Sequence, residues 1–222
     1  MYIEHYMTKI PVTVGPETPI GEVKGILETK HFRHLPVVGD DGCLLGMVTD
    51  RDIRSAYPSC VDTGKQHKDE IWKISQSPVG EIMSKDVVSL SSYATLDDAL
   101  ILLNRHKVGA LPVIDSHHKV IGVFSVRDLI MAYTTLFGLG ERGSVLVGVK
   151  DDGKPRPLTR IVHTLEEHDI HFSRVVRSKS MVPGQHSQTI SVRVNTMNLR
   201  AVHRALEEAG FVVDPMLPEQ PL

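Results

Sequence analysis

The chain has 222 residues, of which 41% are hydrophobic and 23% are charged. This composition is typical of a folded globular protein and excludes a disordered tail or a fibre. Lys and Arg number 25 against 27 Asp and Glu, so the formal net charge is −2 and no overall field attracts nucleic acid or an anionic membrane. Cys43 and Cys60 form neither a CxxC pair nor a zinc spacing, which is the usage expected in a reducing cytoplasm.

The N-terminal sequence shows no targeting signal. MYIEHYMTKIPVTV has an acid at Glu4 and no apolar run of signal-peptide length. No other window approaches the roughly 20 apolar residues that a spanning helix needs. We therefore expect a cytoplasmic protein that has no membrane segment and no nucleic-acid partner.

An internal repeat occupies the first 130 residues. When the chain is aligned with itself at an offset of 76, residues 7–53 (copy one) match residues 83–129 (copy two) without a gap. Identical pairs include Pro36/Pro112, Gly46/Gly122 and Asp52/Asp128. Two copies are too few for a solenoid, so we expect two halves that pack around a pseudo-twofold axis.

Each copy predicts the order strand, helix, strand, strand, helix. The strands are β-branched or apolar runs bounded by turn sequences. They are expected at residues 12–14, 35–38 and 44–48 in copy one and at 88–90, 111–114 and 120–124 in copy two. The polar stretch 56–70 predicts a surface connection, followed by short helical pieces at 71–74 and 79–83.

Helix starts are marked by capping residues. In copy one, Thr18 is the expected N-cap, with Pro19 at the first helical position. In copy two, Thr95 is the expected N-cap, and Asp98 follows three residues later as in a capping box. The second helix of each copy is expected to start at Thr49 or Ser125.

Three glycines in six residues, at 138, 140 and 143, mark a boundary after copy two. Beyond it, strands are predicted at residues 144–149, 172–177, 190–194 and 211–213. Apolar stripes at helical spacing predict helices around residues 158–165 and 199–209, the second ending at Gly210. The order βαββαβ is that of the ferredoxin-like fold.

The strongest candidate for ligand chemistry occurs once in each copy, from Gly46 to Asp52 and from Gly122 to Asp128, with the pattern Gly-apolar-apolar-Thr/Ser-x-Arg-Asp. A hydroxyl at a helix start caps the helix and can donate to a phosphate near the positive helix end. The following acid lies on the same helical face and can accept from the two hydroxyls of a ribose. N-capping explains either copy alone, but the recurrence in both favours a ligand site.

The two copies resemble the tandem CBS (cystathionine-β-synthase) domain pair, in which a Gly-apolar-x-Thr/Ser-x-x-Asp segment binds the ribose and phosphate of an adenosine ligand. The resemblance covers residues 1–135. It rests on the openings Met-Thr-Lys and Met-Ser-Lys, on Val-Thr-Val and Val-Ser-Leu, on Arg-His-Leu-Pro-Val-Val, and on the two Gly-to-Asp segments. It implies two adenosine clefts in a pseudo-twofold pair of βαββα domains.

The resemblance also implies which residues line the clefts. Adenine would pack against the first strand of each copy, ribose would lie on Asp52 and Asp128, and phosphates would lie near Thr49 and Ser125. The expected nucleotide-binding residues are Ile10, Thr13, Val14, Arg33, His34, Pro36, Thr49, Arg51 and Asp52 in copy one and Asp86, Ser89, Leu90, Pro112, Ser125, Arg127 and Asp128 in copy two.

The two clefts are not equivalent in sequence. Copy one carries Arg33 and His34 before its Leu-Pro-Val, where copy two carries Gly109 and Ala110. A guanidinium binds phosphate in a fork, so Arg33 and His34 are candidate phosphate ligands, although a solvated surface pair explains them equally well. If they are ligands, the two clefts differ in affinity.

The C-terminal residues 144–222 resemble an ACT domain, a small regulatory module that often dimerises and binds amino acids. The matching stretch is residues 149–158, near the Asp-x-Pro-Gly-x-Leu turn of that family. Where that family has a Gly, this chain has Arg156, whose side chain would crowd a ligand, so dimerisation is as well supported as amino-acid binding. A CBS pair followed by an ACT unit is similar to the bacterial acetoin-utilisation accessory protein family.

Other patterns indicate neither an enzyme nor a metal site. The glycines at 138, 140 and 143 match the dinucleotide fingerprint in letters, but they follow a helix and precede a strand, which is the reverse of the required context. The twelve histidines lack a cluster of acids and cysteines at metal-ligand spacing. No P-loop, nucleophile-elbow or zinc-protease motif occurs. We therefore expect no catalytic residue, no metal and no catalytic cofactor.

The predicted fold class is α+β, with two tandem CBS domains followed by a ferredoxin-like ACT domain. The boundaries are 1–60 for CBS domain 1, 61–78 for a linker, 79–137 for CBS domain 2, 138–143 for a glycine-rich linker and 144–222 for the ACT-like domain. The expected function is non-catalytic sensing of AMP, ADP, ATP or another adenosyl ligand by a homodimer that regulates an enzyme or other protein partner. The alternative is an amino-acid-binding or metabolite-binding ACT regulator with the CBS pair as its dimerisation scaffold.

Overall fold

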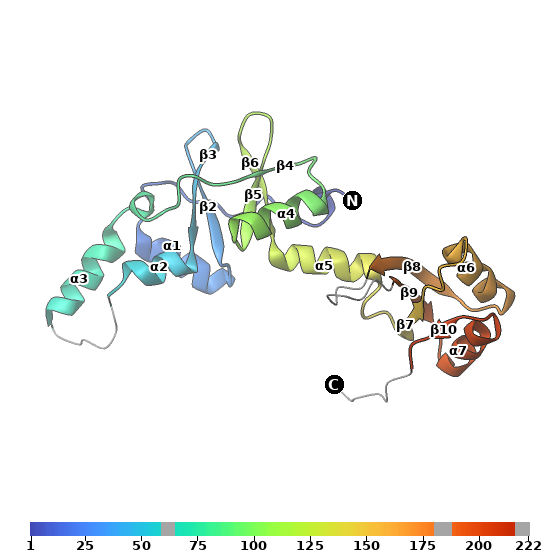
Figure 1. The fold of residues 1–222 in the computed structure, drawn as a ribbon. Helices are drawn as coiled ribbons and strands as arrows, with labels where there is room; N and C mark the ends of the chain where they lie inside the picture. The colour runs from blue at the N-terminus through green and yellow to red at the C-terminus, as the bar shows by residue number, and fades with distance from the viewer. Residues whose placement is uncertain (59–64, 180–187, 216–222) are drawn as a thin grey trace. The chain divides into compact units, whose positions relative to one another are not determined.

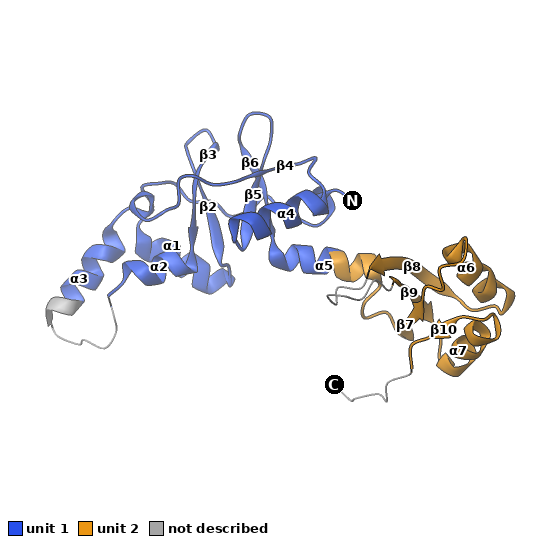
Figure 2. Ribbon diagram, in the orientation of Figure 1, with its two compact units in different colours: residues 1–132 blue, residues 133–222 orange. Residues whose placement is uncertain are grey.

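The computed structural model describes residues 1–58, 65–179 and 188–215 (Figure 1). The chain forms two compact units, residues 1–132 and 133–222 (Figure 2). Within the described ranges, no helix has the length and apolar character that crossing a membrane requires. Cys60 lies outside the described residues.

Unit 1 contains both copies. The elements of copy one are α1 (Ile20–Lys30), β2 (His34–Val38), β3 (Leu44–Thr49) and α2 (Asp50–Ala56), preceded by a 3-10 turn η1 (Ile3–His5) and β1 (Thr8–Lys9). The elements of copy two are β4 (Leu90–Ser91), α4 (Leu96–His106), β5 (Ala110–Ile114), β6 (Val120–Ser125) and α5 (Val126–Phe137), preceded by α3 (Lys65–Gln76) and η2 (Val79–Glu81). Strands β2 and β3 form one sheet, and a second has the order β1-β6-β5-β4.

The segments that lead into each copy and include its first three residues, residues 1–9 and 77–85, are exchanged between the copies, and we call them the lead-in segments. Thr8 in the first lead-in segment pairs with Val123 of copy two, while Ser84 in the second pairs with Met47 of copy one. Adding 76 to Thr8 gives Ser84, and adding 76 to Met47 gives Val123, so the two pairings are equivalent. The exchange is what a pseudo-twofold axis between the copies requires.

Each lead-in segment lies against the glycine that begins the Gly-to-Asp segment of the other copy, Gly46 or Gly122. A Cβ atom on Gly46 would lie 2.7 Å from both the Met83 Sδ and the Ser84 carbonyl oxygen. A Cβ atom on Gly122 would lie 2.7 Å from Met7 Sδ. Only glycine therefore allows the lead-in segments to approach β3 and β6, which explains why the Gly-to-Asp pattern begins with glycine.

The core of copy one also depends on the exchange. Its buried cluster includes Leu35 and Val37 of β2, Val48 of β3 and the helix residues Val23 and Leu27. The same cluster contains Val79, which is fully buried and comes from the second lead-in segment. Copy one is therefore completed by residues that precede copy two in the chain.

Two local predictions for unit 1 are wrong. Thr18 does not cap α1, because the helix begins at Ile20 after the extended Pro19, and the carbonyl of Thr18 accepts from the Val79 N–H at 2.9 Å. The predicted strand 12–14 is reduced to a single bridge between Val14 and Val37. In both cases the backbone forms hydrogen bonds with a distant segment, which local propensity does not reveal.

The predicted surface connection is also partly wrong, because α3 covers residues 65–76 and packs against α1. The contact needs a small residue, since a Cβ atom on Gly21 would lie 3.1 Å from the Ser75 carbonyl oxygen. Trp72 of α3 is 65% exposed. The predicted capping box of α4 is confirmed, with Thr95 and Asp98 bonded reciprocally.

Unit 2 follows the predicted order βαββαβ. Its elements are the C-terminal part of α5, then β7 (Ser144–Lys150), α6 (Pro157–Glu167), β8 (Phe172–Lys179), β9 (Gln188–Asn195), α7 (Leu199–Glu208) and β10 (Val212–Val213). The four strands form an antiparallel sheet in the order β10-β7-β9-β8. The boundary between the units falls within α5, ahead of the glycine-rich residues 138–143.

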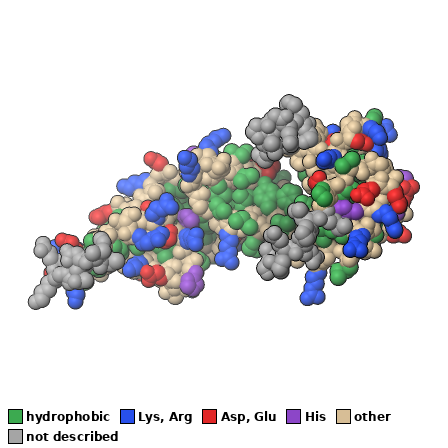
Figure 3. Space-filling view, turned by 60° about the horizontal axis from the view of Figure 1, so that its bottom comes forward, with side chains coloured by type: hydrophobic (Ala, Val, Ile, Leu, Met, Phe, Trp, Pro, Cys, Tyr) green, Lys and Arg blue, Asp and Glu red, His purple; other side chains and the backbone are tan. Residues whose placement is uncertain are grey.

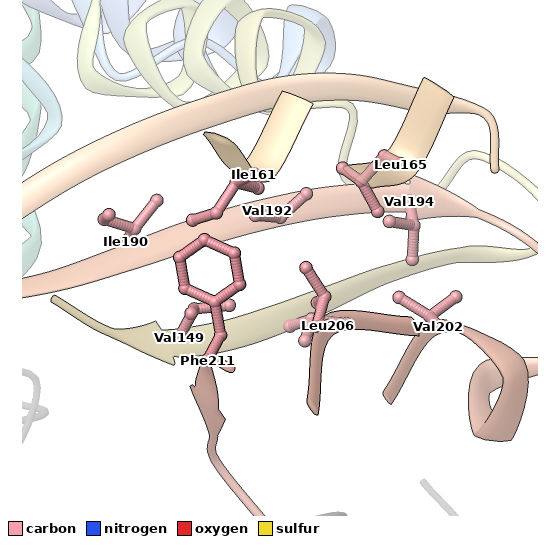
Figure 4. Packing of buried hydrophobic residues seen from close by; sticks show 10 residues of the cluster. Val149, Ile161, Leu165, Ile190, Val192, Val194, Val202, Leu206 and Phe211 are labelled. Atoms are coloured by element: carbon pink, nitrogen blue, oxygen red, sulfur yellow. The ribbon is translucent and has the colours of Figure 1, made fainter. Parts of the chain in front are cut away.

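Alternating side chains of the unit 2 strands face the two helices. Figure 4 shows Ile190, Val192 and Val194 of β9 directed toward Ile161 and Leu165 of α6. This period-two burial on β9 is what the sequence alternation predicts. Gly210 follows α7 with φ +83° and ends the helix as predicted.

Arg156 occupies the position immediately before α6 in the left-handed conformation, with φ 55° and ψ 48°. This region of backbone space favours glycine, which has no Cβ atom. The side chain of Arg156 makes no capping hydrogen bond to the helix. Arg156 therefore adopts this conformation at a backbone cost that a glycine would not have.

Candidate functional site

The duplicated Gly-to-Asp segments end in two nearly identical hydrogen-bond sets. In copy one, the Oδ2 of Asp52 accepts from the Thr49 N–H at 2.8 Å and from its hydroxyl at 2.7 Å, while the Asp52 N–H donates to Thr49 Oγ1 at 3.2 Å. In copy two, the Oδ2 of Asp128 accepts from the Ser125 N–H and hydroxyl, both at 2.7 Å. All four residues are half-buried.

These hydrogen bonds decide what the segments can offer a ligand. The hydroxyl protons of Thr49 and Ser125 are donated to Asp52 and Asp128, so the expected donation to phosphate requires those bonds to open. The Oδ1 atoms of the two acids accept no hydrogen bond from the described parts of the chain. A half-buried carboxylate oxygen held in a fixed orientation suits a ribose hydroxyl.

His34 and Arg33 lie beside the copy one segment. The Arg33 carbonyl accepts from the Asp50 N–H at 3.1 Å, and the half-buried His34 is the first residue of β2. The His34 ring faces Gly109 of copy two, where a Cβ atom would lie 2.8 Å from Cε1 and 3.0 Å from Nε2. His34 therefore contacts both copies, and Gly109 leaves room for its ring.

Burial lowers the pKa of His34 from its ordinary value of 6.5. Asp50 opposes this shift, Arg33 adds to it, and Asp52 opposes it more weakly than Asp50 does. His34 is therefore neutral over a wider pH range in the folded chain than in the unfolded chain. A neutral imidazole has one donor and one acceptor nitrogen, so it can donate to a phosphate without carrying a charge.

We expect the contribution of His34 to the free energy of unfolding to decrease as the pH drops below 6.5. The unfolded chain binds the His34 proton more readily, so this part of the stability is present above pH 6.5 and is lost as the pH falls through the folded-state pKa. His34→Asn should give a smaller loss of urea midpoint between pH 7.5 and pH 5 than the wild type gives. The exposed His106→Asn is the matched control, and an identical pH profile for His34→Asn and wild type would contradict the prediction.

The residues expected around adenine are divided between the two sheets. Val14 is buried and donates its N–H to the Pro36 carbonyl at 3.1 Å, which brings these two expected residues together. Leu90 is buried and pairs with Val113, next to Pro112. The half-buried Thr13 and Ser89 precede Val14 and Leu90.

Ile10 does not lie on the first strand of copy one. It follows β1, and its N–H donates to the Ile121 carbonyl of copy two at 3.4 Å. Ile10 is 93% exposed and has φ 51°, which is an unfavourable conformation for a β-branched residue. Its counterpart Asp86 is also exposed but has no positive φ.

The remaining expected residues are on the surface. Arg51 and Arg127 are exposed, and no hydrogen bond or ion pair within residues 1–58, 65–179 and 188–215 joins either of them to another expected site residue. Phosphate contact by these two arginines stays a prediction.

Two hollows lie near these elements. One of about 310 Å³ is lined by Ser89, Leu90, Ser91, Ala94, Asp98, Ile101 and Leu102, so it includes two expected residues of copy two. Another of about 360 Å³ lies between α2 and α3 and is lined by Ser55, Ala56, Tyr57, Pro58, Glu70, Lys73 and Ile74. The second hollow was not predicted, because the sequence assigned part of α3 to a surface connection. Among the described residues, no three His, Cys, Asp or Glu side chains come together as a metal site.

The family model of the CBS domain matches the chain twice, at residues 3–59 and 79–135. The chain therefore belongs to the CBS domain family, as a tandem pair. Each match includes one Gly-to-Asp segment.

Relatives with known names contain the same module. The inosine-5'-monophosphate dehydrogenase of Mycobacterium leprae is 29% identical over 218 residues, which cover 92% of this chain but 38% of that enzyme. A CBS domain-containing protein of Dictyostelium discoideum is 30% identical over 128 residues and 88% of its own length. The chain thus spans less than two fifths of the length of the dehydrogenase.

Solved structures share the fold. The crystal structure of CBSX2 in complex with AMP has 26% sequence identity and a TM-score of 0.52, and the match covers 61% of this chain and 97% of CBSX2. The crystal structure of a Vibrio cholerae protein assigned to acetoin utilization, AcuB, has 27% identity and a TM-score of 0.53, and the match covers 64% of this chain and 96% of that protein.

Proposed function

We propose that this chain is a non-catalytic regulatory protein that senses an adenine nucleotide or another adenosyl ligand through its CBS pair. The observation that carries the proposal is the pair of half-buried carboxylates, Asp52 and Asp128, held in equivalent positions with Oδ1 free of hydrogen bonds from the described chain. The similarity to CBSX2, whose structure contains AMP, supports an adenosyl ligand.

The proposed binding chemistry uses contacts that differ between the copies. The ribose hydroxyls donate to Asp52 or Asp128 in either cleft. In the cleft that reaches Arg33 and His34, phosphate oxygens accept from a guanidinium and an imidazole. The small side chains at Gly109 and Ala110 provide no such donors at the equivalent positions of copy two.

Titration calorimetry on the full chain tests the proposal. We expect AMP, ADP and ATP to bind with two unequal affinities, and inosine monophosphate to bind more weakly because its base lacks the exocyclic amino group. Arg33→Ala should weaken the binding of ATP more than the binding of adenosine, because adenosine has no phosphate group. The absence of saturable binding by every adenosyl ligand would contradict the proposal, and two identical independent sites would contradict the inequality of the clefts.

A second candidate function places the ligand in unit 2. We propose an ACT-like identity for residues 144–222, supported by the order βαββαβ and the strand order β10-β7-β9-β8. However, Asp152 in the loop before α6 is already bonded by Arg160 at 2.8 Å, and Asp151 is paired with Arg177 at 2.6 Å. This internal neutralisation of the loop favours dimerisation over amino-acid binding, and thermal-shift screening of amino acids beside the nucleotides distinguishes the two functions.

We also propose that the chain forms a homodimer in the cytoplasm and regulates a protein partner, for which the similarity to AcuB suggests a role in acetoin utilisation. Exposed apolar side chains support the dimer. Figure 3 shows hydrophobic side chains gathered over α5, where Ile130 is 61% and Met131 is 59% exposed. On α4, Leu100 and Ile101 are 43% and 51% exposed. A patch of this kind is typical of an interaction surface.

We expect Ile130→Arg to weaken the dimer by at least about tenfold, because a charge would replace an exposed apolar side chain of the patch. Light scattering coupled to gel filtration would then shift from twice the 24.6 kDa chain mass toward the monomer. Arg54, the counterpart of Ile130 in copy one, supplies the control variant Arg54→Ala, which should remain dimeric. A wild-type chain that is monomeric at all concentrations would disprove the dimer.

A further inference from the structure

The two ends of helix α5 are both held by side chains: a candidate ligand site caps its N-terminus, and an arginine of unit 2 binds its C-terminal turn. Its first turn is capped by Ser125 and Asp128, the expected ribose site of copy two. Its last turn ends at Gly138, which has φ +64°. There the N–H of Leu139 donates to the Thr134 carbonyl at 2.9 Å and that of Gly138 to the Thr135 carbonyl at 3.2 Å, which is the Schellman pattern of helix termination.

Arg174 of β8 binds this last turn. Its Nη2 donates to the Thr135 carbonyl at 2.9 Å, its Nε donates to the Leu136 carbonyl, and its Nη1 donates to Ser173 Oγ at 2.9 Å. The Arg174 side chain is 26% exposed and lies 3.6 Å from the Glu141 carboxylate. A guanidinium on the carbonyl end of a helix is favourable, because the helix dipole is negative there.

The approach of Arg174 to α5 depends on Gly138. A Cβ atom at Gly138 would meet the Arg174 guanidinium, so a larger residue requires that side chain to move. The glycine that resembled part of a dinucleotide fingerprint therefore has two structural roles: it ends the helix, and it leaves space for Arg174.

A second arginine reaches the same turn indirectly. Arg193 of β9, the register partner of Arg174, is 8% exposed and donates to Ser144 Oγ at 3.0 Å. The Ser144 hydroxyl in turn donates to the Gly138 carbonyl at 3.1 Å. Two neighbouring strands of the unit 2 sheet are thus bonded to the end of α5. Arg174 donates to carbonyl groups there, and Arg193 is connected to the same turn through the Ser144 hydroxyl.

We infer that Arg174 is a positioning residue that transmits ligand occupancy at the Ser125–Asp128 cap to the strands of unit 2. This inference rests on the proposed function, because the ligand must first bind at Asp128. A ribose hydroxyl that donates to Asp128 Oδ1 adds a hydrogen bond to the carboxylate whose Oδ2 caps the helix, so the first turn of α5 has different contacts with and without ligand. Only such a difference can shift an equilibrium elsewhere, and the hydrogen bonds of Arg174 connect α5 to β8.

Hydrogen exchange on the full chain, with and without AMP at saturation, tests the coupling. In the wild type we expect AMP to slow exchange in the peptides covering β8 (Phe172–Lys179) by at least threefold. In Arg174→Ala this change should disappear while calorimetry still shows saturable AMP binding. Arg174→Lys keeps the charge but cannot form the fork, so it should restore less than half of the change. Lys179→Ala, which removes an exposed charge from the same strand, should behave as wild type.

The outcomes separate the two claims. If the wild type shows no saturable AMP binding, the proposed function fails and the coupling fails with it. If AMP binds but β8 exchange does not respond, or responds equally in Arg174→Ala, the coupling alone is overturned. If Arg174→Ala is unfolded, as seen by loss of its circular dichroism, the folded Arg174→Lys variant decides, and a full AMP response in it overturns the coupling.

Discussion

Replacing Asp52 and Asp128 together with alanine should weaken AMP binding at both clefts in a chain that remains folded. Each carboxylate accepts from Thr or Ser through Oδ2, which leaves Oδ1 for a ribose hydroxyl. A hydrogen bond to a charged group contributes about 1.5–3 kcal/mol, which corresponds to roughly a 10- to 100-fold loss of affinity for each cleft. Calorimetry with AMP on each single variant would assign the two affinities to the two copies.

The control for this experiment is built into α4. Asp98 forms a capping box with Thr95 at distances of 2.8, 2.7 and 3.2 Å, equal to those between Asp52 and Thr49. Asp98→Ala therefore removes the same kind of cap without removing an expected ribose ligand. Because Asp98 lines the copy two hollow with Ser89 and Leu90, its effect is compared with that of Asp52→Ala on the copy one cleft. Should Asp98→Ala reduce AMP affinity as much as Asp52→Ala does, the effect belongs to capping and the ribose assignment is wrong.

Gly46→Ala and Gly122→Ala should each destabilise the chain by about 3 kcal/mol, at the upper end of what overpacking costs. The added methyl group of Gly46→Ala would lie 2.7 Å from the backbone oxygen of Ser84, which cannot move without breaking the bridge between Ser84 and Met47. At Gly122 the methyl group would lie 2.7 Å from Met7 Sδ and 3.1 Å from the Thr8 carbonyl oxygen. Chemical denaturation measures both effects.

A glycine in the same copy provides the matched control. Gly25 lies within α1, and no atom lies within 4 Å of a Cβ built there. Gly25→Ala should therefore stabilise the chain by about 0.5–1 kcal/mol through helix propensity. If Gly46→Ala were as well tolerated as Gly25→Ala, the close approach of the lead-in segment would not hold in solution.

Features that depend on neighbouring residues were predictable from the sequence. The reciprocal caps at Thr95 and Thr49 follow from residues three positions apart, and the alternation of Ile190, Val192 and Val194 follows from the period of a strand. These are the parts of the fold in which local chemistry and the final structure agree.

Features that depend on distant partners were not predictable. Thr18 has the residue type of an N-cap, but its carbonyl is taken by Val79 from the second lead-in segment. Residues 65–70 are polar, and their sequence predicts a surface connection. They belong instead to α3, which contacts α1 where Ser75 lies beside Gly21. At the candidate site, the sequence identified Thr49 and Ser125 but could not show that their hydroxyl protons are committed to Asp52 and Asp128.

The exchange of lead-in segments determines where the chain can be cut. A fragment that ends near residue 58 would lack Val79 from the core of copy one and Ser84 beside Met47. It would also retain Thr8 and Ile3, whose partners Val123 and Ala94 lie in the missing half. The smallest piece able to fold is therefore the whole pair. Truncation of the first residues of the chain is expected to destabilise copy two before copy one.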